Sequence, residues 1–127
     1  VAQDLSAVTA ACLVLRRTVF DEVGGFDAAH LSIAYNDIDF CLRIRARGYR
    51  ILWTPHAELY HHESASRGQD ADPEAQARFT REAEYMQKVW GHLLSNDPAY
   101  NPNLALDRAD FSLAYPSRAP RPWLALP

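Results

Sequence analysis

Asp37 is the first residue of this sequence whose type and position suggest chemistry. Residues 36–47 have the pattern of an amphipathic helix, with Asn36 as the predicted N-cap. Asp39 is explained by that helix, because it can complete a capping box and pair with an arginine one turn later. Asp37 serves neither purpose and lies off the apolar stripe. We therefore consider it a candidate general base, a carboxylate that takes a proton from an attacking hydroxyl.

Asp37 also has simpler explanations. A carboxylate in the first turn of a helix is favoured by the helix dipole whatever else it does. With Asp39 it spells D-x-D, a pattern that can bind a metal ion on a loop. Residues two apart on a helix point to nearly opposite sides, however, so we do not expect this pair to hold one ion.

Two histidines, His61 and His62, form the second candidate site. They end a predicted extended segment over residues 57–62, and adjacent strand residues face opposite ways, so at most one of them enters a given site. That histidine is either a half-buried structural residue or, with carboxylates from elsewhere, one ligand of a divalent ion. A small metal hydrolase built on these histidines and Asp37 is a weaker alternative, since it lacks a third well-placed ligand and a nucleophile set.

A polar loop without a hydrophobic anchor forms the third candidate site, with Ser64, Ser66 and Arg67. Hydroxyls and a guanidinium suit a phosphate group. A solvated loop without a ligand explains the same residues equally well. The sequence contains no glycine-rich phosphate loop of the Walker or dinucleotide-binding type.

Strands and helices must position these residues. Residues 8–15 are nearly continuous apolar sequence, which predicts a strand buried on both faces, and a short helix over residues 17–23 follows. Residues 50–54 predict a second strand. A long helix is expected to begin at Pro73 and to end near residue 95. Its predicted buried stripe consists of Phe79, Ala83, Met86, Trp90 and Leu93.

Two short stretches could border a ligand. The small side chains of Ala10 and Ala11 would let a ligand approach the strand backbone, although packing explains them as well. Gly24-Gly25 ends the short helix and permits positive φ. Phe26 is expected to anchor the following loop in the core. We expect Asp27 to cap that loop in preference to lining a pocket.

Composition indicates a globular chain. It has 127 residues, 48% of them hydrophobic, which suits one domain with a modest core. A net charge of -3 argues against a nucleic-acid partner, and no apolar run approaches the roughly 20 residues that a membrane helix needs. Cys12 and Cys41 lie in apolar segments and are expected to be buried free thiols. Because the sequence begins without Met and almost directly with a strand pattern, we expect a piece of a longer protein.

Five motifs agree in order and spacing with a known family. They are residues 8–17, 24–27, 36–43, 48–50 and 55–64, and together they resemble the C-terminal half of family 2 glycosyltransferases, which are inverting enzymes of the GT-A fold. The long helix and residues 97–104 resemble the tail of a bacterial subgroup that acts on surface polysaccharides.

The resemblance implies a fold class: an α/β chain with a partial GT-A fold, comprising a few strands, a central short helix and a long C-terminal helix. Residues 1–70 would be the acceptor and catalytic-base half, and residues 71–115 the C-terminal helix with a turn-rich extension. Residues 116–127, which contain four prolines, would form a tail.

The resemblance also implies roles for individual residues. Asp37 matches the acid that serves as catalytic base, and His61 matches a position where these enzymes often place a histidine on the divalent ion. Ser66 and Arg67 match a loop that folds over the nucleotide diphosphate. Asn36 stands where many members have Glu or Asp, which keeps the base but removes a neighbouring charge. The loop that borders the sugar and acceptor pocket is matched by Gly24, Gly25, Phe26 and Asp27.

By the same resemblance the complete enzyme would bind a nucleotide-sugar donor, a saccharide or lipid-linked acceptor, and Mg²⁺ or Mn²⁺. It would work in the cytoplasm or at the inner face of the membrane. The family's nucleotide-binding βαβ units and metal-binding D-x-D belong to an N-terminal half that the printed sequence does not contain. We therefore expect no sugar transfer by this chain alone, and an open strand edge that favours self-association. The alternative is a non-catalytic binding or assembly module on the same scaffold.

Overall fold

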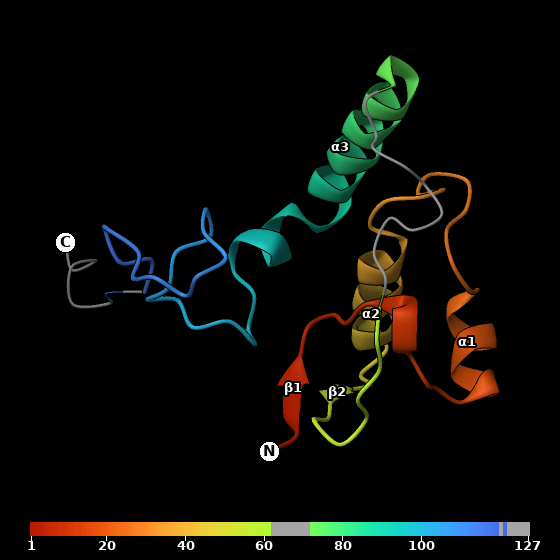
Figure 1. Cartoon of the computed structure of the whole chain (residues 1–127), viewed down its shortest axis with the longest axis horizontal. Coiled ribbons are helices and arrows are strands. Elements are labelled where there is room, and N and C mark those ends of the chain that lie inside the picture. Colours follow the sequence, from red (N-terminus) through yellow and green to blue (C-terminus); the bar gives the residue numbers. More distant parts are fainter. Residues whose placement is uncertain (62–71, 120, 122–127) are drawn as a thin grey trace. The chain divides into compact units, whose positions relative to one another are not determined.

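Three α-helices and a two-stranded sheet make up the computed structural model, which describes residues 1–61, 72–119 and 121 (Figure 1). In chain order the elements are β1 (Gln3–Leu5), the 3-10 turn η1 (Ala10–Cys12), α1 (Arg17–Val23), α2 (Asn36–Ala46), β2 (Ile51–Trp53) and α3 (Pro73–Ser95). The chain divides into two compact units, Val1–Gly91 and His92–Pro127. All elements except the end of α3 belong to the first unit.

The core of the first unit forms around α2, as its apolar stripe indicates. Phe40 and Cys41 have no exposed surface, and Ile44 one turn later is buried as well. Val19 of α1 and Ile51 of β2 pack against this face. The predicted central helix is therefore confirmed as the element around which the unit is packed.

Aromatic rings extend this core toward the loop after α1. The ring centroids of Phe20 and Phe26 lie 5.5 and 4.6 Å from that of Phe40. Phe26 is nevertheless 41% exposed, so it anchors its loop at the margin of the core and not inside it.

β1 and β2 pair in antiparallel fashion, with Asp4 opposite Leu52. The predicted second strand is confirmed, but the predicted buried strand over residues 8–15 is wrong. That segment contains η1, where the Thr9 hydroxyl accepts a backbone N–H two residues later. Val14 is 93% exposed. Within the described ranges no strand pairs with this segment, so it lacks the covering layers that a strand buried on both faces requires.

The two cysteines differ in burial. Both are free thiols, and Cys41 is buried as predicted. Cys12 is exposed, which contradicts the prediction. The reason is the same as for Val14, because η1 lies where the buried strand was expected.

α2 begins in a way that the sequence did not indicate. Its N-cap is Tyr35, in the left-handed conformation with φ of 60°, and Asn36 is the first helical residue, so the predicted Asn36 cap is wrong. Tyr35 makes no side-chain capping hydrogen bond. Asp39 accepts the Nε–H of Arg43 at 2.7 Å, which confirms the predicted pair, and its other oxygen accepts the indole N–H of Trp90 at 2.8 Å. The first turn of α2 is therefore held by α3 and not by a capping box.

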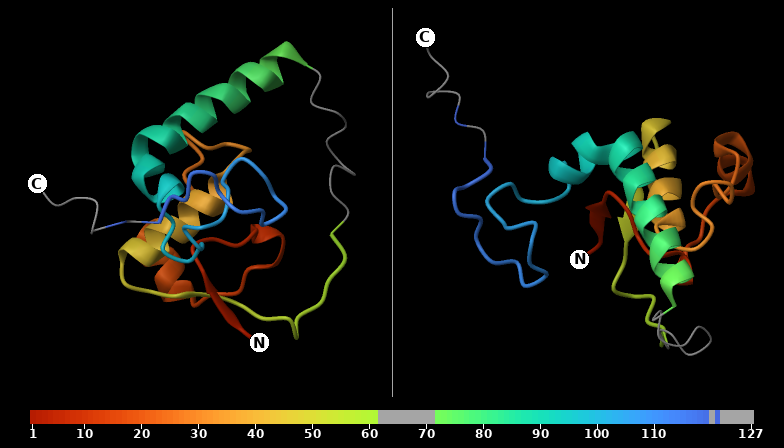
Figure 2. Two further views of the ribbon diagram at one scale, coloured as in Figure 1. Left: turned by 90° about the vertical axis from the view of Figure 1, so that its left-hand side faces the viewer. Right: turned by 90° about the horizontal axis from the view of Figure 1, so that it is seen from above.

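α3 confirms the long helix, but its buried face differs from the predicted stripe. Its buried residues are Ala75, Glu82 and Met86, of which only Met86 belongs to that stripe. Phe79 is 53% exposed, and the other three predicted residues are half-buried. In both views of Figure 2 the middle of α3 passes close to the orange segment between α1 and α2, to which Glu82 is hydrogen-bonded. No helix in the described ranges is both long enough and apolar enough to cross a bilayer.

The second unit is mostly turns. An isolated antiparallel bridge joins Leu104 to Leu113. Arg118 donates hydrogen bonds to the carbonyl oxygens of Ser95 and Leu104, at 2.8 and 3.3 Å. None of the candidate site residues from the sequence lies in this unit.

Candidate functional site

Asp37 lies in the first turn of α2 and is half-buried. Its Oδ2 accepts the backbone N–H of Ala10 at 3.2 Å, and its Oδ1 accepts that of Ile38 at 2.9 Å. Asp37 therefore has a structural contact beyond the helix dipole considered above, because the carboxylate joins α2 to η1. The small side chain of Ala10, for which ligand approach and packing were equally open, leaves room for this carboxylate. A carboxylate has about four lone-pair sites, so these two bonds leave capacity to accept from a hydroxyl group.

The backbone just before α2 is held by Glu82 of α3. Its Oε1 accepts the backbone N–H and the hydroxyl of Ser32 at 3.1 and 2.8 Å, and the N–H of Ile33 at 3.3 Å. Its Oε2 accepts the N–H of Ala34 at 2.6 Å. Burial acts to raise the pKa of Glu82, but these four hydrogen bonds outweigh it and hold the pKa below its ordinary value. A side chain that is only 3% exposed thus carries its charge because the loop supplies the donors that water would otherwise supply.

Asp27 caps its own loop, which confirms the preferred prediction. Its Oδ1 accepts the backbone N–H groups of Ala29 and His30 at 3.2 and 3.1 Å. Its Oδ2 accepts the hydroxyl of Tyr85 on α3 at 3.0 Å and lies 2.9 Å from Nδ1 of His30. Burial acts to raise the pKa of Asp27, but the hydrogen bonds with His30 and Tyr85 outweigh it and lower the pKa overall. The rings of His30 and Tyr85 also stack, with centroids 4.5 Å apart, so α3 holds this loop at a second point.

The glycines after α1 have a conformational explanation. Gly24 and Gly25 have φ of 81° and 69°, values that L side chains rarely adopt. A Cβ atom on Gly25 would also lie 2.9 Å from the ring of Phe20. Their role at the border of a sugar pocket, and that of Phe26 and Asp27 beside them, stays a prediction.

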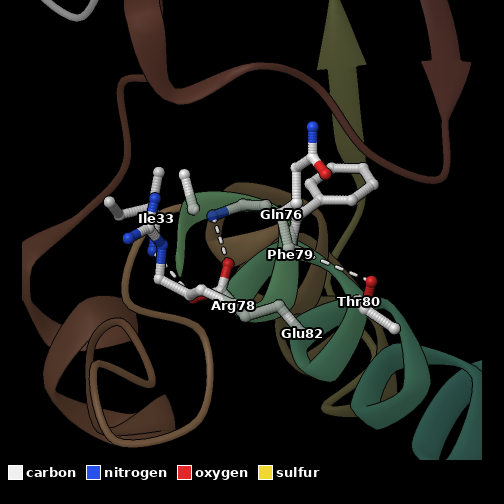
Figure 3. Close-up of a pocket in the computed structure, with 8 residues that line it drawn as sticks. Ile33, Gln76, Arg78, Phe79, Thr80 and Glu82 are labelled. Carbon is white, nitrogen blue, oxygen red and sulfur yellow. Dashed lines mark hydrogen bonds between the residues drawn. The ribbon is translucent and has the colours of Figure 1, made fainter. Parts of the chain in front are cut away.

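A cavity of about 530 Å³ lies between the loop before α2 and the first turns of α3 (Figure 3). Its loop wall is formed by Ile33 and Ala34, and its helix wall includes the side chain of Glu82. The exposed ring of Phe79 provides an apolar surface and packs against Tyr35, with centroids 5.4 Å apart. The rest of the lining is Ala75, Gln76, Arg78 and Thr80.

The sequence did not reveal this cavity. Phe79 was assigned to the helix core, and the polar residues around it have the spacing of an ordinary solvated helix face. An aromatic surface beside amide, guanidinium and hydroxyl groups suits a polar ligand that has an apolar face.

Of the three candidate sites from the sequence, only Asp37 and His61 lie in the part of the chain that the structure describes. His61 is exposed in extended chain after β2. Within residues 1–61, 72–119 and 121, no group of three His, Cys, Asp or Glu side chains could hold a metal ion. The role of His61 as a metal ligand stays a prediction. The candidate residues that lie outside the described ranges are His62, Ser64, Ser66 and Arg67.

Comparison with known proteins finds that this chain is similar to short segments of longer proteins. It is 59% identical over 114 residues, or 90% of its length, to an uncharacterized protein, y4gI, of Sinorhizobium fredii. It is 41% identical over 107 residues, or 84% of its length, to the O-antigen biosynthesis protein RfbC of Myxococcus xanthus. Over 63 residues, or 50% of its length, it is 35% identical to the N-acetylglucosaminyl-diphospho-decaprenol L-rhamnosyltransferase of Mycobacterium tuberculosis.

The matched segments cover 12%, 8% and 20% of these three relatives. No family model and no solved structure matches the chain. One relative is named for O-antigen biosynthesis and another for rhamnosyl transfer, which supports a relationship to glycosyltransferases. Membership of family 2 and the GT-A fold stay predictions.

Proposed function

We propose that this chain forms the acceptor side of a glycosyltransferase, in which Asp37 is the base that activates an acceptor hydroxyl. The sugar would come from a nucleotide-sugar donor and be transferred with inversion, in the synthesis of a bacterial surface polysaccharide. The observation that carries the proposal is the half-buried Asp37 carboxylate in the first turn of α2. After its two backbone contacts it can still accept a hydrogen bond from a hydroxyl group. The names of the relatives from Myxococcus and Mycobacterium support glycosyl transfer in polysaccharide synthesis.

In this mechanism Asp37 takes the proton of the acceptor hydroxyl while the hydroxyl oxygen bonds to the anomeric carbon and the nucleoside diphosphate leaves. Attack opposite the leaving group inverts the configuration at that carbon. The N–H groups of Ala10 and Ile38 orient the carboxylate, since each of its oxygens already holds one hydrogen bond. The base therefore needs little reorganisation when the acceptor binds.

The donor side is part of the proposal only for the protein at its full natural length. Bound Mg²⁺ or Mn²⁺ would offset the charge that develops on the leaving diphosphate. The described residues do not by themselves form a metal site, so we assign the ion no step in this chain. His61 is proposed as one of its ligands, and Ser66 and Arg67 as diphosphate contacts.

Asp37→Asn tests the proposal, because it keeps the size of the side chain and removes the base. We expect kcat to fall by about 100- to 10,000-fold with little change in KM for the donor. The assay would use the protein at its full natural length and a panel of nucleotide-sugars that includes a nucleoside-diphospho-rhamnose. The acceptor would be N-acetylglucosamine linked through a diphosphate to a polyprenol, a choice suggested by the name of the Mycobacterium relative.

The matched control is Asp21→Asn, which removes an exposed carboxylate of α1 that pairs with Arg17. It changes the net charge equally and is expected to leave kcat unaltered. Activity of Asp37→Asn within a few-fold of the wild type would remove Asp37 from the role of base.

A non-catalytic binding or assembly module is the second candidate. The hydrogen bond from Ala10 to Asp37 favours it, because this bond gives the carboxylate a structural purpose without any reaction. Absence of transfer by the wild type with every donor in the panel, together with a lower unfolding midpoint for Asp37→Asn, would support this candidate over the enzyme.

A further inference from the structure

Glu82 and the loop before α2 form an internal anion-binding nest. Three consecutive backbone N–H groups, those of Ser32, Ile33 and Ala34, converge on its carboxylate, and the Ser32 hydroxyl is a fourth donor. Such a concave arrangement of N–H groups is a general site for anions. Here the anion comes from a helix that lies 48 to 50 residues away in the sequence.

A short and constrained stretch of backbone joins this nest to Asp37. Only Tyr35 and Asn36 lie between Asp37 and Ala34, the last residue of the nest. Tyr35 has a φ of 60°, which non-glycine residues adopt uncommonly, and its carbonyl oxygen accepts the N–H of Asp39 at 2.9 Å. Tyr35 contributes no side-chain cap, so the backbone leads directly from the nest into the first turn of α2.

We propose that Glu82 is a positioning residue for the Asp37 carboxylate, which it places by fixing the loop at residues 32–34. The inference rests on the proposed role of Asp37 as a base. A displacement of about 1 Å by a distant substitution can cost about 100-fold in rate. Glu82 therefore affects the proton transfer without touching the acceptor.

The charge of Glu82 matters as well as its shape. All four groups that face it are donors, and a glutamine amide offers one acceptor oxygen and an NH₂ group that cannot accept. The low pKa of Glu82 agrees with this, because the loop favours the ionised form. Glu82→Gln therefore keeps the volume of the side chain, but its NH₂ group faces backbone N–H groups that also donate.

α3 has further anchors, which allow positioning to be separated from folding. The Tyr85 hydroxyl donates to Asp27 at 3.0 Å, and the Trp90 indole donates to Asp39 at 2.8 Å. Met86 is buried between these two contacts in the sequence. Glu82→Gln should therefore release the loop while α3 stays in place.

The experiment compares Glu82→Gln with Glu84→Gln in the transfer assay, with the protein at its full natural length. Glu84 is an exposed residue of the same helix, and within the described ranges it makes no hydrogen bond or ion pair. We expect Glu82→Gln to lower kcat on the order of 100-fold with both KM values unchanged, and Glu84→Gln to match the wild type. Circular dichroism at the assay temperature would confirm that both variants are folded. Faster hydrogen exchange at residues 32–34 in Glu82→Gln would show that the nest has opened.

The double variant Asp37→Asn, Glu82→Gln tests whether the two residues act together. If Glu82 acts through Asp37, its substitution costs little once the carboxylate is gone. If Glu82→Gln is folded and has wild-type kcat while Asp37→Asn is inactive, this inference alone is overturned. It is also overturned if the loss of kcat in the double variant equals the product of the losses in the two single variants. An active Asp37→Asn would overturn the proposed function and this inference with it.

Discussion

Two segments of this chain whose apolar side chains were expected to be buried, residues 8–15 and α2, have opposite surroundings. Each contains one cysteine, yet Cys41 in α2 has no exposed surface and Cys12 is exposed. Their large apolar side chains differ in the same way: Phe40 of α2 is fully buried, while Val14 is 93% exposed.

The difference between them lies in what covers each segment. α2 packs against α1 and β2, and α3 holds its first turn. Leu13 and Leu15 pack against the core, but within the described ranges no element covers the opposite side of their segment. An apolar run therefore indicates that burial is favourable, while burial itself depends on contacts that are distant in the sequence.

The largest expected effect is a difference in the rates at which the two thiols are alkylated. Burial raises the pKa of Cys41, whose Sγ donates to the carbonyl oxygen of Val8 at 3.6 Å, so little reactive thiolate forms. We expect iodoacetamide to modify Cys12 rapidly and Cys41 only when the core opens. For a domain stable by about 5 kcal/mol, this slows Cys41 by more than about a thousandfold. Mass spectrometry of Cys12→Ser and Cys41→Ser would measure each rate separately, and similar rates in the native state would contradict the contrast.

Truncation of one side chain from each segment should give the next largest effect. Phe40→Ala removes a buried ring that contacts Phe20 and Phe26, and we expect it to lower the free energy of unfolding by about 3–5 kcal/mol. Val14→Ala should change it by less than about 0.5 kcal/mol, because that side chain is already in water. Urea titration followed by tryptophan fluorescence would give both values. A large loss in Val14→Ala would mean that residues 8–15 are covered in solution.

The elements that the sequence predicts correctly are those with local signals. Gly24 ends α1 in the left-handed conformation, Pro73 begins α3, and β-favouring residues form β2. The errors concern long-range contacts. The expected Asn36 capping box fails because Asn36 is itself helical and the Asp39 carboxylate is bonded to Trp90, 51 residues away. The expected strand over residues 8–15 fails because no partner strand is available in the described ranges.

The candidate site follows the same rule. Asp37 is identifiable because it lies outside the apolar stripe of α2, but its contact with Ala10, 27 residues away, has no local signal. Glu82 was missed, although its spacing of three residues from Phe79 and four from Met86 places a charge on a predicted apolar face. A buried carboxylate needs donors, and that spacing is the one sign in the sequence that a loop would supply them.

Two ion pairs extend the comparison of buried and exposed surroundings to polar contacts, and their substitution is expected to change the free energy of unfolding least. Arg43, 25% exposed, pairs with the 3% exposed Asp39 of α2 and also donates to the carbonyl oxygen of Val23 at 2.7 Å. Arg50, 70% exposed, pairs with the 46% exposed Asp4 across the sheet. Arg43→Ala should lower the free energy of unfolding by about 1–3 kcal/mol, because a buried carboxylate loses a donor. Arg50→Ala should leave it unchanged within error, because water and salt screen an exposed pair.

Urea titrations at low and high salt would separate the two ion pairs. The loss in Arg43→Ala should persist at high salt, since a buried pair is screened little, and any loss in Arg50→Ala should disappear. Equal losses that respond equally to salt would mean that the surroundings of α2 do not strengthen its contacts. Burial by distant partners would then explain the packing of that helix, but not the strength of the polar contacts that hold its first turn.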